Sequence, residues 1–158
     1  MMIGFNHLDR AFARGLLAAA LLVPCATWAD APLRTAQLRV GPHPLKVEIV
    51  ETDPQREKGL MFREKLGRDD GMLFIYEEPG YHAMWMKNTL IPLSVAFVDR
   101  DGVILNIEEM QPQTLESHMS AGPASYSIEA NKGWFAQKGV KPGDKVTGLP
   151  PRKAQLKK

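Results

Sequence analysis

The sequence is poor in cysteine, in net charge and in long apolar runs, and each shortage excludes a class of protein. Its single cysteine, Cys25, lies near the amino terminus, so the rest of the 158 residues can form no disulfide bond and no thiol nucleophile. The formal net charge is only +2, which leaves no electrostatic footprint for nucleic acid. We therefore expect neither a disulfide-stabilised module nor a nucleic-acid-binding protein.

Arrangements typical of common catalytic and cofactor sites are missing as well. No histidines or acidic residues follow the spacing of a zinc site, and no glycine-rich loop could cradle a phosphate. His43, His82 and His118 lie in unrelated segments, which does not favour a serine hydrolase. We expect no cofactor, and we leave open whether the protein is an enzyme, with a binding role favoured.

The amino terminus has the three-part layout of a secretory signal. Arg10 and Arg14 form a basic region, residues 15–23 are apolar, and small residues precede a cleavage point after Ala29. Nine apolar residues make about 14 Å of helix, less than half of a bilayer core of roughly 30 Å. We expect an exported protein, periplasmic or secreted, with no transmembrane span after cleavage.

Cleavage after Ala29 would leave 129 residues with a net charge of +1, the size of one domain. The alternative is a lipoprotein anchored at Cys25, although a proline directly before that cysteine is unusual for such a site. We expect a monomer with these parts: a signal peptide at 1–29, a leader at 30–36, a single β-rich domain at 37–150 and a basic tail at 151–158.

Apolar and polar residues alternate over 38–40 and 45–51, a period of two that predicts half-buried strands. Thr52 or Asp53 can cap a helix that fades by Gly67. Further strands are predicted at 71–76, 81–86, 93–98, 103–108, 126–130 and 145–147, and a second short helix at 131–138.

The predicted strands define the fold class. The segments 72–76 and 93–98 are apolar throughout, which predicts core strands paired with each other. An Asp-Gly turn at 99–102 predicts a hairpin. We expect a mainly β, β-rich α+β domain: an antiparallel sandwich, jelly-roll-like, or a partly open barrel with one or two short helices.

Several ordered motifs over residues 37–149 resemble those of the family known as domain of unknown function 192 (DUF192). They are REKGLMFR at 56–63, GMLF at 71–74, MWMKNT at 84–89, IPL at 91–93, VAFVD at 95–99, then Tyr126, Glu129, GWF at 133–135 and GD at 143–144. The resemblance implies an often exported bacterial or archaeal β-domain with no established activity. The family usually has an aspartate where this chain has Ser94, so any chemistry of that aspartate would be lost here.

Lys87, Asn88 and Thr89 form the first candidate binding site. Together they offer an ammonium group, an amide and a hydroxyl directly after an apolar strand, and these groups could meet a carboxylate, a phosphate or sugar hydroxyls. The structural alternative is that Asn88 and Thr89 bond to the backbone of a turn.

Arg56 and Arg63 could complete an anion-binding pocket with Lys87. Seven residues apart on the predicted helix, they would lie near one face. The alternative, which we favour, is that they pair with nearby acidic residues; Glu48, Glu129 and Asp144 are available.

His82, Met84 and Met86 would point to one side of a regular strand. An imidazole and two thioethers are ligands suited to Cu(I). The alternative, which we favour, is that both methionines fill the core.

Three functions follow from these residues. The first is a binding module for an anionic or polyhydroxylated component of the cell envelope. The second is an enzyme acting on such a component, with Lys87 and either Glu129 or Asp144 handling protons. The third is a Cu(I)-handling protein.

Overall fold

The structure is a computed structural model that describes residues 32–151. The predicted signal peptide with Cys25 and most of the basic tail lie outside these residues. Within residues 32–151, no helix has both the length and the apolar character needed to cross a membrane.

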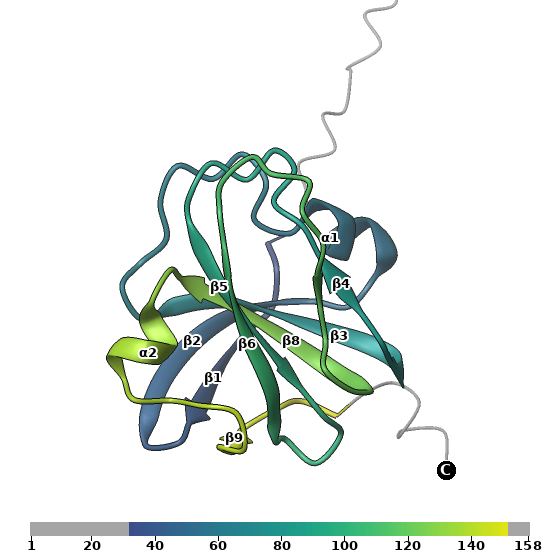
Figure 1. Cartoon of the computed structure of the whole chain (residues 1–158), viewed down its shortest axis with the longest axis vertical. Helices are drawn as coiled ribbons and strands as arrows, with labels where there is room; N and C mark the ends of the chain where they lie inside the picture. Colours follow the sequence, from purple (N-terminus) through teal and green to yellow (C-terminus); the bar gives the residue numbers. More distant parts are fainter. Residues whose placement is uncertain (1–31, 152–158) are drawn as a thin grey trace, which may run out of the picture. The chain divides into compact units, whose positions relative to one another are not determined.

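The described chain is mainly β, as predicted (Figure 1). Its elements are β1 (Thr35–Val40), β2 (His43–Val50), α1 (Asp53–Lys58), β3 (Asp70–Gly80), β4 (Ala83–Met84), β5 (Leu93–Val98), β6 (Ile104–Met110), β7 (His118–Met119), β8 (Ala124–Asn131), α2 (Trp134–Gln137) and β9 (Val146–Thr147). The strand β1 begins at Thr35, inside the segment that the sequence assigned to a leader.

Seven strands form one curled, half-barrel sheet in the order β6-β5-β8-β3-β2-β1-β9, and β4 pairs with β7 in a second, small sheet. The pairs are antiparallel except for β2 with β3, which run parallel because α1 carries the chain across between them. The prediction that residues 72–76 and 93–98 pair with each other was wrong, since β8 lies between β3 and β5. The predicted hairpin at 99–102 is confirmed.

The central strands β3, β5 and β8 are buried on both faces and separate two apolar clusters. On β8, Ile128 and Ala130 point into the first cluster. Because strand side chains alternate, Glu129 points the other way, toward the cluster that lies between the main sheet and β4. This alternation places the carboxyl group of Glu129 in a largely apolar layer.

Helix α1 is shorter than predicted. Thr52 caps it in a capping box with Gln55, which confirms one of the two predicted caps. It ends at Gly59, whose φ of 45° suits glycine, and a Cβ there would lie 3.3 Å from the Phe74 ring. Arg63 therefore lies beyond the helix, and the prediction that it shares a helix face with Arg56 was wrong.

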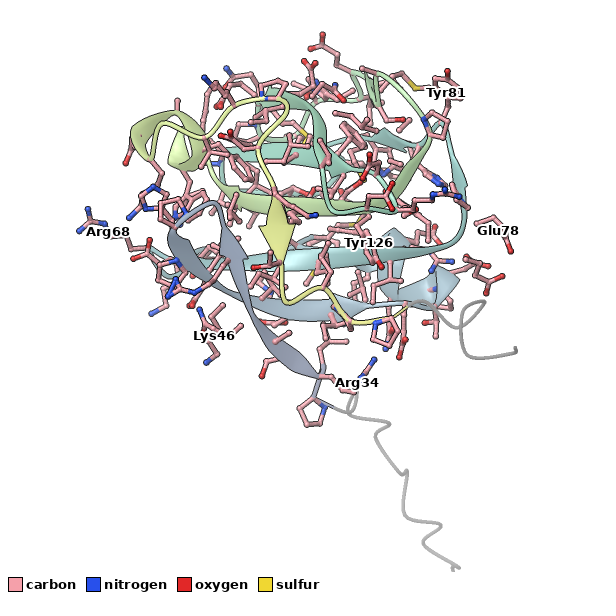
Figure 2. The ribbon with its side chains drawn as sticks, turned by 90° about the horizontal axis from the view of Figure 1, so that it is seen from below. Arg34, Lys46, Arg68, Glu78, Tyr81 and Tyr126 are labelled. Atoms are coloured by element: carbon pink, nitrogen blue, oxygen red, sulfur yellow. The ribbon has the colours of Figure 1, made fainter. Side chains whose placement is uncertain are left out.

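The predicted strand at 81–86 was also wrong in extent. The strand β3 continues to Gly80, and only Ala83 and Met84 then pair, with β7. Side chains still alternate along this segment: Met84 and Met86 are buried, whereas Tyr81 projects from the surface (Figure 2) and Trp85 is exposed. The loop predicted between residues 111 and 124 contains β7.

Candidate functional site

Three segments meet beside α1 and are tied by backbone hydrogen bonds. The amide of Phe62 donates to the carbonyl of Asn88 at 2.9 Å, and the amide of Gln113 donates to the carbonyl of Thr89 at 3.1 Å. Within residues 32–151, the non-glycine residues with positive φ are Phe62, Asn88 and Gln113, at 64°, 55° and 59°. Such backbone strain tends to collect at functional sites, and it is most costly at a bulky residue such as Phe62.

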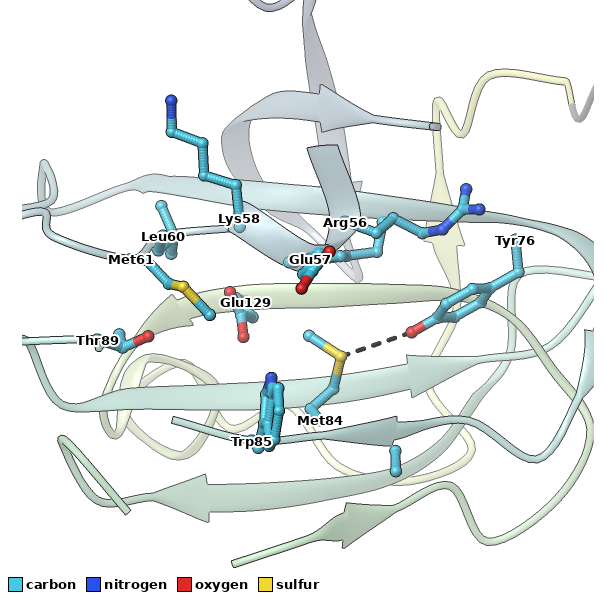
Figure 3. A pocket seen from close by; sticks show the side chains of 13 residues that line it. Arg56, Glu57, Lys58, Leu60, Met61, Tyr76, Met84, Trp85, Thr89 and Glu129 are labelled. Atoms are coloured by element: carbon cyan, nitrogen blue, oxygen red, sulfur yellow. Dashed lines mark hydrogen bonds between the residues drawn. The ribbon is translucent and has the colours of Figure 1, made fainter. Parts of the chain in front are cut away.

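A cavity of about 380 Å³ opens beside this cluster (Figure 3). Residues of α1, of the turn after it, and of β3, β4 and β8 line it. Its wall includes the apolar side chains of Leu60, Met61, Phe74 and Met84, the ring of Trp85 and the hydroxyl group of Thr89. The volume falls in the range of small-molecule sites, and a mostly apolar wall with a few polar groups is typical of them.

Glu129 is the buried acidic group of this cavity. The residue is only 4% exposed, and its carboxyl group has no hydrogen-bond or ion-pair partner among the described residues. Burial raises the pKa of Glu129 to about 8 from its ordinary value of 4.5. The carboxyl group is therefore mostly protonated at pH 7. A perturbed carboxyl group in a cleft marks a candidate functional residue.

The other charged side chains of the cavity come from α1. Arg56 donates to the carbonyls of Glu51 and Ile75, at 2.7 and 2.8 Å, and pairs with Asp53. Figure 3 shows its guanidinium group and the Lys58 side chain directed away from Glu129. Glu57 is exposed at the cavity wall. Because the cations are directed elsewhere, no charge attraction lowers the pKa of Glu129.

Trp85 is half exposed, and its indole nitrogen faces the cavity (Figure 3). The ammonium group of Lys87 lies 5.3 Å from the centroid of the Trp85 ring, which is cation–π distance. Lys87 thus holds the aromatic ring from outside the cavity and does not line it.

Of the three predicted residues Lys87, Asn88 and Thr89, only Thr89 belongs to the cavity lining. Thr89 lines the cavity, although its hydroxyl group is oriented by the carbonyl of Lys87 at 3.4 Å. Asn88 turns the backbone and directs its amide to the sulfur of Met61 at 3.9 Å. Binding by these three residues stays a prediction.

Arg56 and Arg63 are not brought together. Arg63 pairs with Glu48 in a separate hollow of about 350 Å³, and this hydrogen-bonded contact raises the pKa of Arg63. Asp144, one of the predicted proton-handling carboxylates, accepts a hydrogen bond from the amide of Lys141 in a turn and does not line the cavity.

The predicted copper ligands lie along one side of the segment, as expected for alternating side chains. The His82 ring stacks on Tyr76 with centroids 3.5 Å apart, and the Tyr76 hydroxyl group donates to the sulfur of Met84 at 3.5 Å. Burial lowers the pKa of His82, so its imidazole favours the neutral form. Met86 is fully buried in the core. Copper binding stays a prediction.

Ser94 makes structural contacts. Its hydroxyl group accepts from the amide of Gly133 at 2.8 Å and bonds to the carboxylate of Glu109 at 2.7 Å. Gly133 begins α2. The Ser94 side chain thus fixes the start of this helix, and it lies outside the lining of the cavity.

Glu129 was predicted from the sequence only as one possible partner for other residues. The available signal was a single glutamate within the apolar strand at 126–130. Burying an unpaired carboxyl group lowers the stability of a protein. A glutamate in such a strand therefore indicates a role other than stability.

The fold and the cavity together define a small β-domain with a ligand-sized pocket beside α1. The chain belongs to the DUF192 family, whose model, described as "Uncharacterized ACR", matches residues 36–148. Among curated proteins, none matches this chain.

The solved structures that are similar to this chain include the following two. One, from Sinorhizobium meliloti 1021, is described as a "putative transcription regulator"; it is 36% identical, has a TM-score of 0.73, and the match covers 76% of this chain and 98% of that one. The other is a protein of unknown function from Novosphingobium aromaticivorans DSM 12444, 36% identical with a TM-score of 0.70, and the match covers 75% of this chain and 93% of that one.

Proposed function

We propose that this protein is a binding module that takes a small, hydroxylated molecule into the cavity beside α1. The observation that carries the proposal is Glu129, a buried carboxyl group that has no partner among the described residues and opens onto a cavity of about 380 Å³. An unpaired buried polar group costs about 1–3 kcal/mol. A ligand that bonds to Glu129 would remove this cost on binding.

The charges of the cavity favour a polyhydroxylated ligand over an anionic one. The exposed carboxylate of Glu57 would repel an anion, while Arg56 already bonds to two carbonyls and an aspartate. A protonated carboxyl group both donates and accepts, as sugar hydroxyls do. Trp85 adds an aromatic surface and an N–H donor at the wall.

The first 29 residues support export, so we propose an envelope component as the source of the ligand. Regulation of transcription, suggested by the description of the S. meliloti relative, receives no support from a net charge of +2.

A thermal-shift titration of the purified protein with matched open-chain sugar derivatives tests the proposal. Ligand that binds only the folded state raises Tm by mass action. We expect at least one of sorbitol, glucamine and gluconate to raise Tm, and Trp85→Ala to abolish the shift. Tyr81→Ala is the control, because Tyr81 is 68% exposed and does not line the cavity. No shift with any of them, or equal shifts in the Trp85 variant, would overturn the proposal.

A second candidate is an enzyme in which Glu129 transfers protons. The supporting observation is that burial raises the pKa of Glu129 to about 8, close to neutral pH, where acid–base catalysis is most effective. Lys87 would not be its partner, because its ammonium group lies on the Trp85 ring outside the cavity. Turnover of a bound ligand that Glu129→Gln abolishes without loss of binding would favour the enzyme.

A further inference from the structure

We infer that the ligand carries an ammonium group and that this group pairs with the carboxyl group of Glu129. The inference rests on the proposed function and deepens it by naming the chemical class: an organic amine with hydroxyl groups. Its basis is the geometry of the cavity, where an acidic side chain reaches the inside and the basic side chains are directed elsewhere (Figure 3).

The first step is the missing counter-charge. Buried acidic groups in proteins are paired with a cation or kept neutral by a proton. Glu129 has no ion-pair partner within residues 32–151, and no neighbouring charge lowers its pKa. A ligand cation would supply the partner that the described fold does not.

The second step is that nothing basic in the cavity lining competes for the carboxyl group. Arg56 is held by two backbone carbonyls and by Asp53, and its guanidinium group is directed away from Glu129 (Figure 3). The Lys58 side chain likewise points away from Glu129. Glu57, exposed at the cavity wall, adds a second negative charge that attracts an incoming amine.

The third step is the fit of the wall. An alkylammonium group has an apolar stem, which the thioethers of Met61 and Met84 and the ring of Trp85 can contact. Thr89 offers a hydroxyl group at the same wall for the rest of the ligand. Tyr76, the remaining titratable group of the lining, has a pKa raised to about 12 by burial and stays neutral.

Binding of an amine moves one proton. The protonated carboxyl group of Glu129 releases its proton to water and becomes the carboxylate that pairs with the ligand, which stays an ammonium ion throughout. With a pKa of about 8, the group is about 0.9 protonated at pH 7, so about 0.9 proton is released per ligand bound. A neutral or anionic ligand would leave that proton in place.

The test compares three compounds that share a chain of hydroxyl groups: glucamine has an ammonium group at one end, sorbitol a hydroxyl group and gluconate a carboxylate. Isothermal titration in buffers of different ionisation enthalpy gives both affinity and proton release. We expect glucamine to bind at least about tenfold more tightly than sorbitol, with release of about 0.9 proton at pH 7. Its affinity should rise about tenfold per pH unit between pH 6 and 7.5 and level off above pH 8.

Glu129→Gln should abolish both the preference for glucamine and the proton release, since the amide cannot ionise. Glu116→Gln is the matched control, the same substitution at an exposed carboxylate that does not line the cavity, and should keep both the preference and the proton release. Sorbitol or gluconate binding as tightly as glucamine, with no proton released, would overturn this inference and leave the proposed function standing. Absence of binding by all three would overturn both.

Discussion

Replacing Glu129 by glutamine should change the pH dependence of stability in a calculable way. The folded state raises the pKa of Glu129 from 4.5 to about 8, so the folded protein binds this proton more tightly than the unfolded chain. Stability from this group is therefore complete below pH 4.5 and is lost as the pH rises toward 8. The amide of the Glu129→Gln variant has no proton to exchange over this range and would not titrate.

The size of the effect follows from the two pKa values. Between pH 5 and pH 8, ionisation of Glu129 in the unfolded chain lowers the free energy of unfolding by about 3 to 4 kcal/mol. Other titrating groups contribute to the pH dependence of stability in both proteins. For example, folding lowers the pKa of His82 below the ordinary histidine value of 6.5, so this group makes stability rise with pH below pH 6.5. Both proteins share these contributions, which cancel in the difference.

The assay is urea unfolding of the native protein and of Glu129→Gln at half-unit steps from pH 5 to 8.5. We expect the two free-energy curves to separate steadily, with the variant gaining stability relative to the native protein as the pH rises. Parallel curves for the native protein and Glu129→Gln would refute the reasoning, because they would mean that Glu129 has an ordinary pKa in the fold.

Three smaller perturbations test the structural features around the cavity. Ser94→Ala should lower the free energy of unfolding by about 1–3 kcal/mol, because it leaves the Gly133 amide and the Glu109 carboxylate without their partner; urea unfolding measures the loss. Phe62→Gly should raise Tm, since glycine adopts φ of 64° without strain and the ring is 66% exposed; a fall in Tm would show that the ring packs. Gly59→Ala should destabilise by about 1–3 kcal/mol in the same unfolding assay, because its φ is positive and a Cβ there crowds a ring; unchanged stability would contradict this.

Much of the fold was predictable because its signals are local. Alternating side chains located β1 and β2, and continuous apolar runs located β3 and β5. The cap at Thr52 is likewise a local hydrogen bond. The end of α1 was not predictable in this way, because it depends on the approach of Gly59 to Phe74, a residue of another strand.

The candidate site was predicted only in part, for the same reason. The segment 84–89 does supply Trp85 and Thr89 to the cavity, but Lys87 and Arg63 found other partners, an aromatic ring and Glu48. Which partner a long charged side chain takes depends on neighbours that are remote in sequence. Local patterns do not report those neighbours.

The sequence by itself determined where the central strands lie, which family the chain belongs to, and which classes of protein the shortage of cysteine and charge excludes. Each of these depends on residue type and on near neighbours in the chain. Only the tertiary structure decided that β8 separates β3 from β5 and that β2 and β3 are parallel. It also decided the chemistry of Glu129, whose pKa depends on how fully segments far apart in the chain exclude water from it.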